Sequence, residues 1–192
     1  MTEEVDKRLP DEALAAQASA GDRRAFGDLV RRHQDGVFGF VLRMVGSRDE
    51  AMDLTQDSFL KAWQALPGWR PEARFRTWLL QIARNASLDV LRRRSLATFV
   101  PIDEALELPG AGPTPETQAV MMQDLRLLEA ALLRLQPDHR EVLLLRELEG
   151  LSYEEIASVL GVAEGTVKSR IGRARAALLH AWKGRHGGHP ND

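Results

Sequence analysis

The chain has 192 residues, a formal net charge of -2, 44% hydrophobic residues and no cysteine. This length and apolar content suffice for two compact units, and the lack of cysteine excludes disulfides, thiolate zinc sites and thiol switches within the chain. No stretch approaches the roughly 18 apolar residues of a membrane span, so we expect a cytoplasmic protein with no direct membrane insertion.

Helical signals run through the first half of the chain. Asp11 has the position of an N-cap for a short helix, and from about Arg23 apolar residues recur at helical spacing. Ser47 and Glu50 form a capping-box pattern, which predicts the start of a third helix. An arginine-rich loop follows, and a fourth amphipathic helix is predicted over 75–94.

Prolines and glycines interrupt this periodicity between 98 and 118, which predicts a flexible linker. We place one domain at 1–97, a second at 119–185 and a tail at 186–192. Strand signals are almost absent. The predicted fold class is therefore all-α, with two small helical domains joined by the linker and a helix-turn-helix in the C-terminal one.

The second domain carries the more specific local pattern. After a helix start at 114–116, a further helix is predicted over 137–150. Ser152 and Glu155 form a second capping box, and Gly161 sits where a helix must end in a left-handed turn. A short helix, a tight glycine turn and a basic second helix are the ingredients of a helix-turn-helix DNA reader.

A helical wheel of that second helix separates two faces. Val167, Ile171, Ala174 and Leu178 fall on the core side. The opposite face and its flanks mix small residues with long cations, which lets a helix lie deep in the major groove. The residues expected to contact DNA are Lys168, Ser169, Arg170, Gly172, Arg173 and Arg175. We expect Lys168, Ser169 and Arg173 at base edges and the other two arginines at phosphates.

Charge is unevenly distributed along the chain. Seven arginines lie in 70–94 and six bases in 164–185, whereas 101–129 holds six acids against one arginine. Two basic blocks favour two contacts on one polyanion. The acidic block between them offers a competitor for the basic surfaces, an inhibitory role that we assign to Asp103, Glu104 and Glu107 as a hypothesis.

Three runs, in order, resemble one known family. The run from Asp53 to Trp63 resembles the polymerase-binding segment of sigma factors, and the run from Phe75 to Asn85 resembles the promoter-melting segment of their extracytoplasmic-function (ECF) group. The runs 150–157 and 165–170 are similar to the second DNA-reading domain of that group. The chain is thus identified as a member of the ECF RNA polymerase sigma factors, group 4 of the sigma-70 family.

The resemblance implies a transcription initiation factor that responds to stress or another signal. Its implied partners are core RNA polymerase, through the coiled coil of the largest catalytic subunit and the flap, promoter DNA, and an anti-sigma factor. The matching polymerase-binding positions are Asp53, Gln56, Asp57 and Leu60. Their spacing of three or four residues places them on one helical face.

The resemblance also assigns the upstream promoter element to the second domain and the downstream, melted element to the first. Asn85 matches the position that lines a pocket for a flipped base, and its amide can read a base edge as donor and acceptor. The full downstream set is Trp69, Arg70, Arg74, Arg76, Arg84, Asn85, Arg92 and Arg93. We expect Trp69 to be exposed, and Trp63 and Trp78 to lie in the core.

The sequence also bears on two other function classes, an enzyme and a DNA-binding regulator. An enzyme is disfavoured because the five histidines show no zinc-ligand spacing and no glycine-rich phosphate loop follows a strand, so we expect no catalytic residue, metal or cofactor. A dimeric helix-turn-helix regulator that binds operator DNA on its own remains open. Such a regulator would bind duplex DNA unaided, whereas a sigma factor would need core polymerase.

Overall fold

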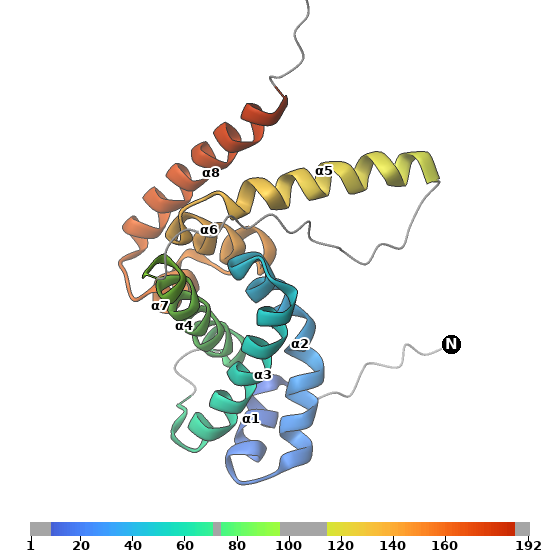
Figure 1. Cartoon of the computed structure of the whole chain (residues 1–192). Coiled ribbons are helices and arrows are strands. Elements are labelled where there is room, and N and C mark those ends of the chain that lie inside the picture. Colours follow the sequence, from blue (N-terminus) through green and yellow to red (C-terminus); the bar gives the residue numbers. More distant parts are fainter. Residues whose placement is uncertain (1–8, 71–73, 97–114, 187–192) are drawn as a thin grey trace, which may run out of the picture.

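The computed structural model describes residues 9–70, 74–96 and 115–186, and all regular elements within these ranges are helical (Figure 1). Most of the predicted linker lies outside the described residues. In the part that is described, no helix is both long and apolar enough to cross a membrane.

The first half of the chain, described over residues 9–70 and 74–96, packs four helices around one apolar centre. Phe40 and Met44 meet Phe75 and Leu79 there, all fully buried, because each helix presents an apolar stripe to the others. The elements are α1 (Asp11–Ser19), α2 (Arg23–Val45), α3 (Arg48–Ala65), the short 3-10 turn η1 (Leu66–Gly68) and α4 (Phe75–Leu96).

Two predicted caps of the first half need correction. Asp11 lies inside α1, whose N-cap is Pro10, and the Asp11 carboxylate instead binds Arg32 at 2.9 Å and His33 at 2.6 Å. Ser47 does accept from the backbone amide of Glu50, but the Glu50 carboxylate pairs with Arg94 of α4. In both cases the carboxylate binds a cationic side chain that is distant in the sequence, instead of a backbone amide at the start of its own helix.

The second half of the chain, described over residues 115–186, contains five helical elements in that range. They are α5 (Pro115–Leu133), α6 (Pro137–Leu143), the π-helical turn η2 (Leu144–Leu148), α7 (Tyr153–Leu160) and α8 (Glu164–His186). The predicted helix over 137–150 therefore widens in its last turn, where the Glu149 amide donates to Leu144 O at 3.0 Å. Gly150, at φ 66°, then reverses the chain toward α7.

The two halves pack directly on each other, α7 against α4 and α5 against α2 (Figure 1). At the end of α2, Gly46 adopts φ 77°, and a Cβ placed there would lie 3.0 Å from a methyl group of Leu133. Glycine is therefore required at this position for two reasons, the left-handed turn and the close approach of α5. The buried apolar residues of both halves form one continuous cluster.

Candidate promoter and polymerase interfaces

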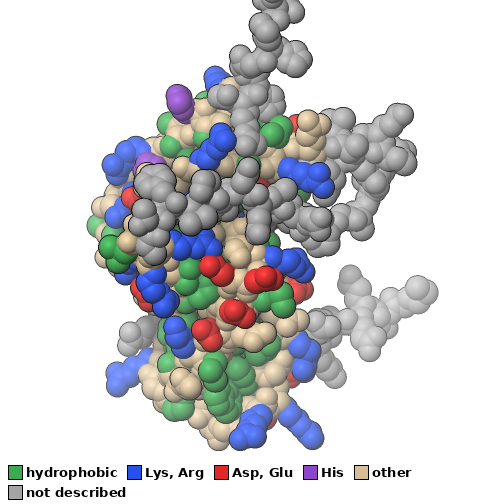
Figure 2. All heavy atoms as spheres, viewed as in Figure 1, with side chains coloured by type: hydrophobic (Ala, Val, Ile, Leu, Met, Phe, Trp, Pro, Cys, Tyr) green, Lys and Arg blue, Asp and Glu red, His purple; other side chains and the backbone are tan. Residues whose placement is uncertain are grey.

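The predicted polymerase-binding residues share the outer face of α3. Asp53, Gln56 and Asp57 are exposed, and Leu60 is 55% exposed. Figure 2 shows acidic side chains gathered over the middle of the molecule, where α3 lies in Figure 1. The face combines carboxylates with an apolar side chain, which suits a partner that presents arginines around an apolar patch.

The helix-turn-helix is assembled from local chemistry. The Ser152 hydroxyl accepts from the Glu155 amide at 3.1 Å, and the Glu155 carboxylate accepts from the Ser152 amide at 2.9 Å, which confirms the predicted capping box. Gly161 ends α7 at φ 66°, and α8 starts at Glu164. The bounds of α7 and the start of the turn to α8 are thus set by nearby residues.

The wheel prediction for α8 is confirmed. Val167, Ile171 and Ala174 are buried, and Leu178 is half-buried against the core. The predicted DNA-facing residues are exposed except for the half-buried Arg170. A Cβ on Gly172 would meet no atom within 4 Å, so the face is open at that point. Arg173 extends along the surface, with its Nε 3.4 Å from Ser169 O.

Two cations of α8 are engaged within the second half. Arg175 donates to Glu147 of η2 at 2.6 Å, and Lys168 lies over the Tyr153 ring with its Nζ 5.6 Å from the centroid. Both contacts lie at the surface, and exposed ion pairs contribute little. A phosphate can therefore compete for these cations at small cost.

The downstream set divides into exposed and partly buried members. Asn85, Arg92 and Arg93 are exposed along α4, as are Arg70 and Arg74 before it. In contrast, the Arg76 and Arg84 side chains are 42% and 16% exposed, because carboxylates of the second half hold them. The structure places these residues on α4 and just before it, but they do not form one continuous open surface.

Trp69 departs from the expectation of exposure. It is half-buried, with its ring centroid 5.9 Å from that of Trp78 and 6.1 Å from that of Phe75. Trp63 and Trp78 pack against the core as predicted, although each keeps part of its surface exposed. The aromatic cluster thus fixes the start of the loop that leads to Arg70.

Four carboxylates of the second half face arginines of the first. Nothing in the amino-acid sequence indicates that Glu129, Glu141 and Glu149 pair with these arginines. Each acid lies close to apolar residues, and its partner is far away in the chain. Arg43 Nη2 lies 2.9 Å from Glu129 Oε1, outside hydrogen-bond alignment. The hydrogen-bonded pairs are Arg84–Glu141 at 2.7 and 3.1 Å and Arg76–Glu149 at 2.5 Å.

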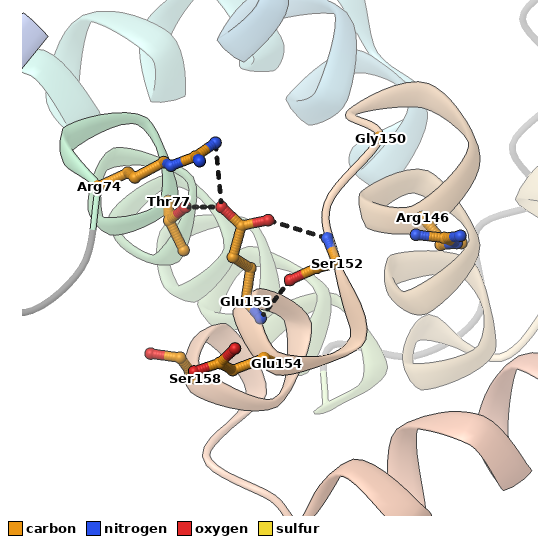
Figure 3. A pocket seen from close by; sticks show the side chains of 8 residues that line it. All are labelled: Arg74, Thr77, Arg146, Gly150, Ser152, Glu154, Glu155 and Ser158. Atoms are coloured by element: carbon orange, nitrogen blue, oxygen red, sulfur yellow. Dashed lines mark hydrogen bonds and ion pairs between the residues drawn. The ribbon is translucent and has the colours of Figure 1, made fainter.

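The fourth carboxylate, Glu155, lies in a polar cleft of about 610 Å³ between α4 and α7 (Figure 3). One of its oxygens caps α7, and the other accepts from Thr77 Oγ1 at 3.5 Å and faces Arg74 at 3.8 Å. The hydrogen bond from the Ser152 amide is the main reason why the pKa of Glu155 is lowered. Glu155 therefore stays ionised and links the helix-turn-helix to the start of α4.

Burial dominates the electrostatics of the other interface groups. It raises the pKa values of Glu129 and Glu149, and the attraction of Arg43 and Arg76 offsets only part of this effect. Burial, with a smaller effect of Arg94, lowers the pKa of Arg140 to about 10. Arg140 thus remains a cation at neutral pH.

Comparison with known protein families decides what these surfaces belong to. The Sigma-70 region 2 family matches residues 29–96, and the Sigma-70 region 4 family matches residues 125–178. A curated relative, the RNA polymerase sigma factor CnrH of Cupriavidus metallidurans, is 38% identical over 175 residues, which cover 88% of this chain and 92% of CnrH. The chain belongs to the ECF group of the sigma-70 family.

A second relative and a solved structure support this membership. ECF RNA polymerase sigma factor SigE of Mycolicibacterium smegmatis is 38% identical over 167 residues, which cover 83% of this chain and 63% of SigE. The solved structure of CnrH in complex with the cytosolic domain of CnrY aligns with TM-score 0.70 and 32% identity, over 91% of this chain and 97% of that chain.

The comparisons favour a sigma factor over a dimeric operator-binding regulator. The region 2 match runs from within α2 to the end of α4, so it includes the exposed face of α3 and the residues predicted to bind the downstream element. The region 4 match includes the helix-turn-helix. Sigma factors as a family are not enzymes. In the described residues no group of histidine, aspartate or glutamate is arranged to hold a metal ion.

Proposed function

We propose that this sigma factor binds core RNA polymerase through the outer face of α3 and reads promoter DNA with α4 and α8, in the cytoplasm. The assignment gives polymerase binding and the downstream element to residues 1–97 and the upstream element to 119–185. The observation that carries it is the presence, in one chain, of an exposed acidic and apolar face on α3 and an open cationic face on α8.

Each face fits the chemistry of its proposed partner. On α3, Asp53 and Asp57 lie one turn apart, and their carboxylates can accept paired hydrogen bonds from arginines of the polymerase coiled coil. On α8, Lys168 and Arg173 flank Ser169 and Gly172, whose small size allows the helix backbone to approach the groove.

Reconstituted transcription tests the proposal. Purified protein and core polymerase should produce specific transcripts from the region upstream of the protein's own gene, whereas core alone should not. Asp57→Lys should abolish complex formation, because it places a cation opposite the arginines expected on polymerase. Asp35→Lys is the matched control, since Asp35 is an exposed acid of α2 outside the proposed face.

The outcome that defeats the proposal is also concrete. A protein that forms no complex with core, yet protects a palindromic site as a dimer, would be an operator-binding regulator. The assignment of Asp53, Gln56, Asp57 and Leu60 to polymerase would then be wrong.

The proposed partners include an anti-sigma factor. The support is a solved structure similar to this chain, the sigma factor RpoE in complex with the anti-sigma factor NepR from Bartonella quintana, which aligns with TM-score 0.69 and 29% identity. Cross-linking in cells under several growth and stress conditions should recover a second protein besides polymerase. Recovery of polymerase alone under every condition would contradict this part of the proposal.

A further inference from the structure

A groove of about 510 Å³ lies in the second half of the molecule, between α5, η2 and α8 (Figure 1). Leucines form most of its walls, among them Leu128 of α5, Leu144 of η2 and Leu178 of α8. The charged residues that line it are Arg43, Glu129, Glu147 and Arg175. Small-molecule sites are typically apolar clefts of about 300–1,000 Å³ that contain a few polar groups, and this groove has that composition.

The wall formed by η2 is irregular in its backbone. Leu144, Glu147 and Leu148 of this π-helical turn all line the groove. Turns of this kind are rare, and they occur frequently at functional sites. Leu148, and Leu125 of α5, are 45% and 37% exposed, so the apolar lining reaches the surface of the protein. A molecule can therefore enter the groove from solvent.

One buried carboxylate of the groove lacks a hydrogen-bond donor. Only 3% of the Glu129 side chain is exposed, and neither of its oxygens accepts a hydrogen bond from the described part of the chain. Arg43 lies 2.9 Å from Oε1 but outside hydrogen-bond alignment. A buried acceptor without a donor costs free energy, so Glu129 needs a donor from water or from a ligand.

The surroundings of Glu129 suit a ligand better than a water molecule. A buried water typically makes about three hydrogen bonds, whereas leucines form most of the walls of this groove. Burial in these surroundings raises the pKa of Glu129, and shifted carboxyl groups of this kind cluster at binding sites. A molecule with an apolar body and one donor would contact the leucines and satisfy Glu129 at the same time.

The charges that line the groove balance one another, which favours a neutral occupant. Arg43 faces Glu129, and Arg175 donates to Glu147 at 2.6 Å, where both of these side chains are more than half exposed. A cationic ligand at Glu129 would be repelled by Arg43, and an anionic ligand would be repelled by Glu129 itself. The linker acids, to which the sequence assigned an inhibitory role as a hypothesis, lie outside the described residues; they are Asp103, Glu104 and Glu107.

We propose that the groove between α5, η2 and α8 binds a neutral small amphiphile, a molecule with an aromatic or aliphatic body and one N–H or O–H group that donates to Glu129. The groove shares no residue with the proposed polymerase face on α3. It shares only Arg175, at its mouth, with the proposed DNA contacts. This site therefore does not depend on the assignment of those surfaces.

Two neutral dyes test the proposal on the full chain. N-phenyl-1-naphthylamine has an apolar body and one N–H donor, and its fluorescence rises in apolar surroundings. Its N-methyl derivative keeps the aromatic body but has no donor. The parent protein should bind the first dye saturably, with one dye per chain. It should bind the N-methyl dye about fivefold more weakly, because Glu129 then stays without a donor.

Two leucine variants locate the bound dye. Leu148→Trp should fill the mouth of the groove and weaken binding of both dyes by about tenfold, because bulk added to a packed site is costly. Leu179→Trp is the matched control, since Leu179 is 52% exposed on α8 and does not line the groove. Both leucines are exposed, so neither replacement disturbs the buried core.

Two variants of Glu129 test the hydrogen bond. Glu129→Leu should bind the two dyes with equal affinity, because the acceptor is removed. Glu129→Gln keeps a carbonyl acceptor and should retain a preference for the dye with the N–H group. A loss of this preference in Glu129→Leu, with its retention in Glu129→Gln, separates the hydrogen bond from a general effect on packing.

Three outcomes would overturn the proposal. They are the absence of saturable dye binding to the parent, equal affinity of the parent for both dyes, and equal dye affinities of Leu148→Trp and Leu179→Trp. If the parent binds no dye and Leu148→Trp prevents complex formation with core polymerase, the groove is a contact for a protein partner instead. None of these results decides the proposed function, which is tested by specific transcripts from the holoenzyme.

Discussion

Arg173 is an exposed cation of α8 to which we assign contact with a base edge. Replacing Arg173 with alanine should cost about 1–3 kcal/mol at the cognate upstream element, because a bidentate contact to a guanine edge would be lost. Binding of the holoenzyme to promoter variants measures this effect. An equal loss on every sequence would instead assign Arg173 to the phosphate backbone.

The prediction for Asn85 concerns strand opening. Its side chain is exposed on α4, and its Oδ1 accepts a hydrogen bond from Arg84 Nη1 at 3.1 Å. Asn85→Ala should impair strand opening more than initial promoter binding, because capture of an extruded base compensates for lost stacking of about 1.4 kcal/mol per step. Permanganate reactivity of the downstream element measures opening. Normal reactivity in the variant would contradict the pocket role.

At the scale of elements, one buried cation joins three helices. Arg140 of α6 donates to the carbonyls of Leu132 and Leu135 at 3.0 Å, and also to those of Leu133 and Met44. These carbonyls end α5 and α2, where helices leave acceptors unsatisfied.

Arg140→Leu should therefore lower the free energy of unfolding by about 3 kcal/mol, since several buried acceptors lose their donor. Urea denaturation followed by circular dichroism measures this change. Arg134→Leu is the control, because Arg134 is exposed in the turn between α5 and α6. A similar loss in both variants would show that Arg140 has no special role.

Sequence reasoning succeeded where an element is determined by its own residues. The caps at Ser152 and Gly161 and the faces of α8 depend on neighbours within a few positions, so local chemistry predicted them. It failed where a partner lies far along the chain. Glu141 pairs with a residue 57 positions away, and no local pattern distinguishes such an acid from one that faces water.

For the whole molecule, the raised pKa values of Glu129 and Glu149 predict that acid stabilises the packing of the two halves on each other, which we call the closed form. Arg43 faces Glu129, and Arg76, Arg43 and His33 face Glu149. A carboxyl whose pKa is higher in the closed form binds a proton more readily there. Closure is then most stable below the ordinary value of 4.5 and weakens as the pH rises through the raised pKa.

The chain has no cysteine, so Gln17→Cys and His180→Cys introduce one labelling site at an exposed position in each half. Energy transfer between dyes at these two sites should therefore increase as the pH is lowered from neutral toward 4.5. The double variant Glu129→Gln/Glu149→Gln should lose most of this dependence. Glu155 has the opposite sign, but its lowered pKa arises mainly from Ser152 in the same half, so it does not report on closure. An unchanged slope in the double glutamine variant would show that other groups control the response.

The pairing of arginines on α2 and α4 with carboxylates on α5 to η2 has a consequence for recombination between relatives. A chimera that joins the first half of this chain to the second half of another family member would keep Arg43, Arg76 and Arg84, but it would meet a different set of side chains. Unless that set supplies acids at matching places, the chimera would lose its closed form while keeping both helices that we propose to read the promoter. Exchange of modules would thus change the control of the protein as well as its promoter preference.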